Sequence, residues 1–263
     1  CLTNMNLQDL IQIHDQQQRM DITFNDTRRE VTPYVVRHFS LEDKYGFILY
    51  SRLNVENADQ VIQEQIDYFA DLDVDFEWKW FKHDTPFDLH DRLIAHGFEP
   101  EEPEALMALD IEHAPSILLQ SITLGVRRIT DPNEVPSLIK VLEGVWGEPY
   151  ERLEQRLMKD LVEDAEHLSV FAGYAENQPV SVAWIDFHDN QFAGLWGGST
   201  LEAYRGRGYY TSLLAVRLQE AKSRGIRYLV LDASPMSRSI VEKYDFRFVE
   251  YTQPHQYHQK YDV

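Results

Sequence analysis

Residues 197–214 decide the fold of this chain and read Gly197-Gly-Ser-Thr-Leu-Glu-Ala-Tyr-Arg-Gly-Arg-Gly-Tyr-Tyr-Thr-Ser-Leu-Leu214. A strand that ends near Thr200 leads into the turn Arg205-Gly-Arg-Gly208, and an amphipathic helix follows directly. At a spacing of three or four residues, the inner face of this helix is predicted to carry Tyr210, Leu213, Leu214, Leu218 and Ala221.

The glycine turn has the chemistry of an anion site. A turn at a helix N-terminus presents unpaired backbone N–H groups and the positive end of the helix dipole. Gly206 and Gly208 let the backbone approach a ligand closely, and Arg205 and Arg207 add positive charge. We therefore predict that a diphosphate binds at this turn.

Two common phosphate-binding loops do not fit the spacing. A P-loop needs Gly-x-x-x-x-Gly-Lys-[Ser/Thr], and this turn contains no lysine. A dinucleotide-binding fingerprint needs Gly-x-Gly-x-x-Gly, but position 211 is threonine and no parallel βαβ unit opens here.

The turn instead resembles motif A of the GCN5-related N-acetyltransferases (GNAT), which has the pattern [Gln/Arg]-x-x-Gly-x-[Gly/Ala]. Arg205 and Gly208 match, whereas Tyr210 replaces the final small residue. The later segment Ile-Val-Glu-Lys-Tyr-Asp-Phe246 resembles the family's Glu-Lys-x-Gly-Phe, with Asp245 in place of glycine. The resemblance covers roughly residues 126–251, and it implies an α/β fold with a mixed central sheet flanked by helices, the acyl-CoA N-acyltransferase fold.

The order of predicted elements supports this resemblance. After the strand 126–129 come helices at 134–145 and 150–164 and three antiparallel strands at 168–175, 180–188 and 192–200. Then follow a helix at 209–224, a strand at 226–233, a helix at 236–244 and a final strand at 246–251.

The resemblance also implies where the co-substrate acetyl-CoA lies. In this family two central parallel strands splay apart and admit the pantetheine arm, here along Gly198–Leu201. The acyl carbonyl would then be polarised by a backbone N–H group of residues 199–201. The expected cofactor-binding residues are Ser199, Thr200, Leu201, Arg205, Gly206, Arg207, Gly208, Tyr209, Tyr210 and Thr211. No metal is expected.

The catalytic acid of the family has no counterpart at its usual place. Members often carry a tyrosine four residues before the Gly-Phe pair, and that position is Val241 here. Ser239 or Ser237 could touch the cofactor, although capping of the helix by Ser237 is an equally good account. Tyr244 is expected to be a packed aromatic residue.

A base is expected among carboxylates near strand ends. Glu148 lies in a Trp-Gly-Glu-Pro-Tyr turn where the acceptor-side helices would meet, and Asp186 and Asp232 are further candidates. Each could equally be a structural acid, and an amine that is partly deprotonated needs no strong base. The expected catalytic residues are therefore Glu148, Asp186 and Ser239. Trp146, Trp184 and Trp196 flank this region, either as pocket walls or as core residues.

The first half of the chain echoes the second. The strand at 76–81 precedes a helix ending His96-Gly-Phe98, as the strand at 228–232 precedes one ending Tyr244-Asp-Phe246. We predict a duplication, with a degenerate GNAT-like domain at 1–115, a catalytic domain at 126–263 and a linker at 113–125. The first half has no glycine-rich turn. Its opening segment, 2–29, is predicted as one helix and a loop, and a strand is predicted at 31–39.

Charge and composition limit the partners. The formal net charge of −19, from 44 acidic and 25 basic residues, argues against nucleic acid and favours cationic amines, although acidity also serves solubility. No apolar run reaches the roughly 18 residues that span a membrane. The single cysteine, Cys1, allows no internal disulfide, so a cytoplasmic location is expected. Cys1 fits a trimmed cytosolic start better than a processed lipoprotein.

His255 and His258 lack a third metal ligand and are predicted to lie in a polar tail.

These features predict an enzyme that acetylates a primary amine of a small molecule or peptide with acetyl-CoA. Two alternatives remain open: a non-catalytic acyl-CoA-sensing or interaction module, and a transferase with another acyl donor such as charged tRNA, which the acidic surface disfavours. The sequence contains no pattern that indicates an oligomeric state.

Overall fold

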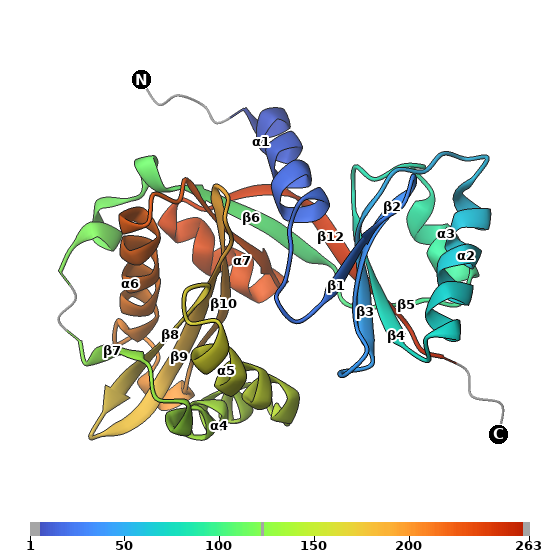
Figure 1. Cartoon of the computed structure of the whole chain (residues 1–263). Helices are drawn as coiled ribbons and strands as arrows, with labels where there is room; N and C mark the ends of the chain where they lie inside the picture. Colours follow the sequence, from blue (N-terminus) through green and yellow to red (C-terminus); the bar gives the residue numbers. More distant parts are fainter. Residues whose placement is uncertain (1–5, 122–123, 260–263) are drawn as a thin grey trace. The chain divides into compact units, whose positions relative to one another are not determined.

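The computed structural model describes residues 6–121 and 124–259, so Cys1 and residues 122–123 of the expected linker lie outside the described residues. The chain forms two compact units (Figure 1). Unit 1 contains residues 1–107, 232–239 and 248–263, and unit 2 contains residues 108–231 and 240–247. The units therefore alternate along the chain. The division into evolutionary domains at 1–115 and 126–263 stays a prediction.

Unit 1 is a sheet covered by helices. Its strands follow the order β1-β2-β3-β4-β12, with β5 also paired to β12. Within residues 6–121 and 124–259, only the pairing of β3 with β4 is parallel among these strands. Its elements are α1 (Leu7–His14), a π-helix (Asp15–Met20), β1 (Arg28–Val31), β2 (Val35–Ser40), β3 (Tyr45–Ser51), α2 (Ala58–Asp71), β4 (Asp75–Phe81), α3 (Leu89–Ala95) and β5 (Glu99–Pro100). Along the chain, β6 (Glu104–Asp110), β11 (Tyr228–Ala233), α7 (Pro235–Val241) and β12 (Arg247–Tyr257) each cross a unit boundary.

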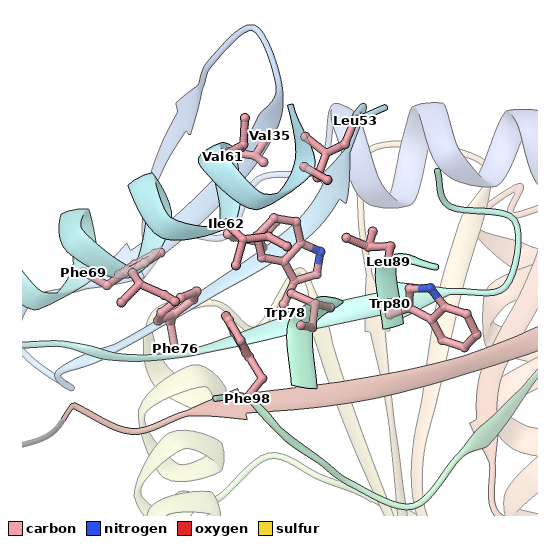
Figure 2. Packing of buried hydrophobic residues seen from close by; sticks show 14 of the residues in the cluster. Val35, Leu53, Val61, Ile62, Phe69, Phe76, Trp78, Trp80, Leu89 and Phe98 are labelled. Atoms are coloured by element: carbon pink, nitrogen blue, oxygen red, sulfur yellow. The ribbon is translucent and has the colours of Figure 1, made fainter. Parts of the chain in front are cut away.

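Alternate side chains of β4 point into the hydrophobic core of unit 1. Phe76, Trp78 and Trp80 are buried on one face of the strand. Figure 2 shows Ile62 and Phe69 of α2 directed toward these rings. The Phe69 and Phe76 rings stack with their centroids 4.2 Å apart. Burial of these large apolar surfaces is the main stabilising contribution of the unit.

Unit 2 is a mixed sheet with helices on both faces. Its strands follow the order β11-β10-β9-β8-β7, and only β10 and β11 are parallel. The elements that lie wholly within it are β7 (Val126–Ile129), α4 (Val135–Trp146), α5 (Glu151–Glu163), β8 (Leu168–Ala175), β9 (Gln178–Phe187), β10 (Phe192–Thr200) and α6 (Tyr209–Ser223), with 3-10 helices at Ile111–His113, Ser116–Leu119, Pro132–Glu134 and Glu202–Tyr204. The three predicted antiparallel strands are confirmed.

The two faces of unit 2 carry different helices. Val170, Val182 and Trp184 point to one face, where they pack with α4 and α5. On the other face, Tyr209 of α6 fills the space beside Gly173 of β8. Figure 1 shows α6 on one side of β8–β10 and α4 and α5 on the other. The end of β10 therefore lies between two helical layers.

Three predicted elements of unit 1 are wrong in part. The opening segment is not one helix, because α1 passes into the π-helix that buries Arg19. The strand predicted at 31–39 is divided by a turn in which Thr32 Oγ1 accepts from the N–H group of Val35. The final strand does not end at 251 but continues to Tyr257, so His255 is fully buried beside β4 rather than in a polar tail.

The predicted linker is partly structured. Leu118 is fully buried in unit 2, and the side-chain amide of Gln219 donates to the carbonyl oxygens of Leu118 and Gln120, both at 2.9 Å. These contacts hold the segment against α6. A polar composition with a proline does not reveal such packing, because the side chain that anchors the segment lies about a hundred residues later in the chain.

Candidate functional site

The open edge of β10 is the first component of the site. β10 pairs in parallel with β11 at Phe192–Gly194, opposite Tyr228–Val230, and this pairing then ends. On its other edge β10 stays paired with β9 as far as Thr200. The edge from Leu195 to Thr200 is therefore not paired with β11, as expected where two parallel strands splay apart.

A bulge shapes this edge. The register between β9 and β10 shifts between Trp196 and Ser199. Within the bulge Gly197 adopts a φ of +63°, and a Cβ atom built on it would lie 1.8 Å from a ring carbon of Trp184. Only glycine fits both the backbone angle and the indole ring. The bulge redirects the last residues of β10.

Hydrogen bonding selects one backbone donor at the end of β10. The Leu201 N–H group donates to Val180 O at 2.9 Å, so it is occupied. Because successive N–H groups of a strand point to opposite edges, the Ser199 N–H group also faces β9 and the Thr200 N–H group faces the open edge. Of the three expected donors, the geometry thus favours Thr200.

The turn after β10 can hold an anion. Gly206 and Gly208 have φ angles of +72° and +90°, and nothing lies within 4 Å of a Cβ atom built on Gly206. The first N–H group that bonds back within α6 is that of Ser212, to Gly208 O at 2.9 Å. The N–H groups of residues 209–211 precede it and have no acceptor within the helix. Arg205 and Arg207 are exposed. Arg205 Nε also donates to Thr200 O at 3.1 Å, so the Arg205 side chain lies at the end of β10 and occupies one backbone acceptor there.

Side chains in the first turn of α6 have different surroundings. The Tyr209 hydroxyl donates to Tyr174 O at 3.2 Å, and its ring is buried. The Thr211 hydroxyl lies 2.6 Å from the Tyr244 hydroxyl, so Tyr244 is a hydrogen-bonded residue and not only a packed ring. Tyr209 and Thr211 can therefore offer a ligand their backbone more readily than their side chains.

The equivalent place in unit 1 is closed. There α2 follows β3 as α6 follows β10, and β3 pairs in parallel with β4. The Asn54 side chain accepts from the N–H groups of Glu56 and Asn57 at 2.8 and 3.0 Å, just before α2 begins. Arg19 Nε donates to Leu49 O of β3 at 2.7 Å. Side chains of the protein thus occupy donors and an acceptor at this edge of β3.

Glu148 follows the helix end that contacts β10. Trp146, at the end of α4, donates from its indole N–H to Ser199 Oγ at 3.0 Å while 46% of its surface stays exposed. A Cβ atom built on Gly144 would lie 3.0 Å from Leu201 Cδ2. Glu148 is exposed two residues after Trp146. The Trp146 indole therefore lies beside the end of β10, and a role for Glu148 stays a prediction.

The other predicted acids, Asp186 and Asp232, both form ion pairs. Asp186 pairs with Gly194, six residues before Thr200, which separates it by about 20 Å from the end of β10. It binds Arg156 at 3.1 Å, and burial raises its pKa to about 6. Asp232 binds Lys79 Nζ at 2.8 Å in unit 1. These contacts favour structural roles for both aspartates.

Ser239 is directed to its own helix. Its hydroxyl is exposed in α7 and donates to Met236 O at 3.0 Å. Trp184, in contrast to Trp146, is a core residue with 5% exposure, whereas Trp196 is 47% exposed. Trp184 therefore fits the core alternative, and a pocket role for Trp146 and Trp196 stays a prediction.

Sequence reasoning missed a buried arginine behind the bulge. Arg217 of α6 has 2% exposure, and its Nη1 donates to Trp184 O and Trp196 O, both at 3.2 Å. Among the described residues no carboxylate is bonded to it, and burial lowers its pKa to about 10. The available signal was its position seven residues after Tyr210 on the apolar face of the helix.

The architecture defines an acyltransferase-type α/β fold, and comparisons with known proteins agree. Residues 135–244 match the model of the "Acetyltransferase (GNAT) family", so the chain carries a GNAT domain there. Among curated proteins, none matches this chain.

Several solved structures share the fold across nearly the whole chain. A functionally unknown conserved protein from Staphylococcus epidermidis is 11% identical, with 91% of this chain and 99% of that chain covered and a TM-score of 0.70. A GCN5-related N-acetyltransferase from Kribbella flavida is 14% identical, with 97% and 95% covered and a TM-score of 0.65. A tandem GNAT protein from the clavulanic acid biosynthesis pathway is 10% identical, with 92% and 86% covered and a TM-score of 0.61.

Within 6–121 and 124–259, no group of three or more histidine, cysteine, aspartate or glutamate side chains is arranged to hold a metal ion. In the same ranges, every helix is too short or too polar to cross a membrane.

Proposed function

We propose that this protein transfers an acetyl group from acetyl-CoA to a primary amine of a small molecule or peptide. The observation that carries the proposal is the open β10 edge that leads into an uncapped α6 N-terminus at Gly206 and Gly208. The backbone N–H groups of residues 209–211, with Arg205 and Arg207, would hold the diphosphate. The Thr200 N–H group would polarise the acyl carbonyl.

The acceptor would approach from the α4 face. Glu148 is exposed there and can receive a proton from an ammonium group through water, while Trp146 presents an apolar wall to an organic amine. The net charge of −19 also favours a cationic acceptor. In unit 1 the Asn54 side chain occupies the N–H groups of Glu56 and Asn57 before α2, whereas α6 has no side-chain cap, so one acetyl-CoA per chain is expected.

Calorimetry tests the site. Acetyl-CoA binding is compared between the wild type and the double variant Arg205→Glu with Gly208→Asp, which reverses one charge and adds a carboxylate where φ is +90°. Binding should weaken by at least about 100-fold, because the charge-assisted contact of Arg205 and the close approach at Gly208 are lost and two carboxylates repel the diphosphate. Lys222→Glu, near the other end of α6 and about 20 Å away, is the matched charge reversal and should bind normally.

Turnover separates the enzyme from its alternatives. CoA release is measured with acetyl-CoA and a panel of primary amines. Binding without release for any amine would favour an acyl-CoA-sensing or interaction module, and release only with a longer acyl-CoA would favour another donor. Equal acetyl-CoA affinity in the wild type and the double variant would refute the site assignment.

A further inference from the structure

The reaction needs an acid that the usual helix does not supply. When an amine displaces CoA, the sulfur leaves as a thiolate and is better expelled if it receives a proton. Val241, at the position where the resemblance places a tyrosine, is apolar and 1% exposed. A proton donor must therefore come from another residue near the open β10 edge.

Tyr210 lies over this edge. It is the second residue of α6, and its ring packs against the bulge, so that a Cβ atom built on Gly198 would lie 3.2 Å from Tyr210 Cε2. The hydroxyl group is carried by the neighbouring ring carbon. In the described part of the chain this hydroxyl forms no hydrogen bond, in contrast to those of Tyr209 and Tyr244.

Arg217 lies behind the same glycine. Its Nη2 is 3.7 Å from the Cβ position built on Gly198, while Nη1 binds the two bulge carbonyls. Burial raises the pKa of the Tyr210 phenol, and the positive charge of Arg217 acts in the opposite direction by favouring the phenolate. At neutral pH the phenol thus keeps its proton, and a fixed cation is present to stabilise the anion that forms when the proton leaves.

We propose that Tyr210 is the catalytic acid that protonates the departing CoA thiolate, with Arg217 as the positioning residue that holds the bulge and stabilises the phenolate. This inference rests on the proposed acetyl transfer. The amine nitrogen bonds to the acyl carbon, the C–S bond breaks, and its electron pair passes to sulfur, which takes the Tyr210 proton. The proton lost by the amine returns to the phenolate through water, so atoms and charges balance.

The placement assigns the two proton transfers to opposite faces of β10. Gly198 faces α6 and Tyr210, whereas Ser199 faces α4 and Trp146, because successive strand residues point to opposite sides. The acceptor and Glu148 lie on the α4 face, and the thiolate and Tyr210 on the α6 face. The tyrosine that departs from the motif A pattern thus has a chemical role that the small residue of the pattern lacks.

Tyr210→Phe removes only the hydroxyl, and Tyr228→Phe on β11 is the matched control, because Tyr228 lies at the paired end of the strand. The variant should bind acetyl-CoA within about twofold of the wild type, while kcat falls by about 100-fold or more. The alkaline fall in kcat, which reports a required protonated group, should disappear. A merely structural tyrosine would change affinity and stability and leave the shape of the pH profile unaltered.

A second measurement needs no acceptor and no turnover. Free CoA is bound to each protein, and its thiol is titrated by the ultraviolet absorbance of the thiolate. The phenol donates to the thiolate, so the thiol pKa should be at least about one unit lower in the wild type than in Tyr210→Phe, a tenfold change in equilibrium. Tyr228→Phe should match the wild type.

The outcomes are distinguishable. If CoA binds but no amine is acetylated, the proposed function fails, and the thiol titration still decides whether Tyr210 contacts the sulfur. If amines are acetylated and Tyr210→Phe keeps both kcat and the thiol pKa of the wild type, Tyr210 is not the acid. Loss of acetyl-CoA binding in Tyr210→Phe would also overturn the proposal, because the hydroxyl would then serve binding.

Discussion

At the scale of the residue, Gly197 leaves less room for a side chain than any other glycine of the described residues. Its φ of +63° costs a residue with a side chain about 1–2 kcal/mol, and the Trp184 ring lies 1.8 Å from where a methyl group would be. We expect Gly197→Ala to lower the free energy of unfolding by about 2–5 kcal/mol, since overpacking adds to backbone strain. Gly225→Ala, at φ +78° with nothing within 4 Å, should cost only the backbone contribution.

Urea unfolding of both variants measures this difference. Equal losses for Gly197→Ala and Gly225→Ala would mean that Trp184 does not pack against the bulge in solution. Single residues also differ in how far the sequence predicts their roles. Gly206 and Gly208 were predictable because they adjoin arginines and a helix start. Gly197 and Arg217 were not, because their partners are a ring and two carbonyl groups on other strands.

At the scale of elements, a charged network joins the π-helix, the segment after β4 and β12. His83 contacts Asp15 through Nε2 and Glu250 through Nδ1, both at 2.7 Å. Burial alone would lower the pKa of His83. The hydrogen bonds and charges of these two carboxylates outweigh burial and raise this pKa to about 10. A raised pKa means that the folded state holds the proton more tightly than the unfolded state.

The stability from His83 should therefore be fully present below pH 6.5 and lost as the pH rises toward about 10. One proton corresponds to at most about 1.4 kcal/mol per pH unit, and the partial exposure of the ring reduces this value. We expect the wild type to lose stability relative to His83→Gln between pH 7 and 9, measured by urea unfolding at each pH. Parallel pH profiles for the two proteins would contradict a charged histidine in the network.

The sequence also predicts some strands more completely than others. The hairpin between β8 and β9 was predicted because Glu176 and Asn177 lie between alternating strands, and both adopt positive φ angles. β12 was predicted only to residue 251, because Thr-Gln-Pro-His-Gln lacks an apolar alternation. Its burial depends on specific bonds, such as Thr252 Oγ1 to Trp80 O at 2.8 Å and His255 Nε2 to His90 Nδ1 at 3.0 Å.

At the scale of the whole molecule, the two compact units do not coincide with the first and second halves of the sequence. Motif and element order predicted the GNAT fold of residues 135–244, because those signals are local. The assignment of residues 248–263 to unit 1 was not predictable, since strand pairing between residues about 170 positions apart leaves no local pattern. The C-terminal strand therefore completes the first half of the chain.

Because β12 belongs to unit 1, fragments of the second half of the chain should differ in solubility according to whether they contain β12. A fragment of residues 108–263 contains β12 without β4, so the pairing of Thr252–Tyr257 with Phe76–Phe81 is lost and a strand edge is exposed. We expect this fragment to aggregate, whereas the fragment 108–247, which lacks the unpaired strand, should be more soluble. Sedimentation measures aggregation, and hydrogen exchange of the amides of residues 252, 253 and 255–257 measures pairing, because Pro254 has no N–H group. A monomeric 108–263 fragment with those amides protected as in the full chain would show that β12 needs no partner from unit 1.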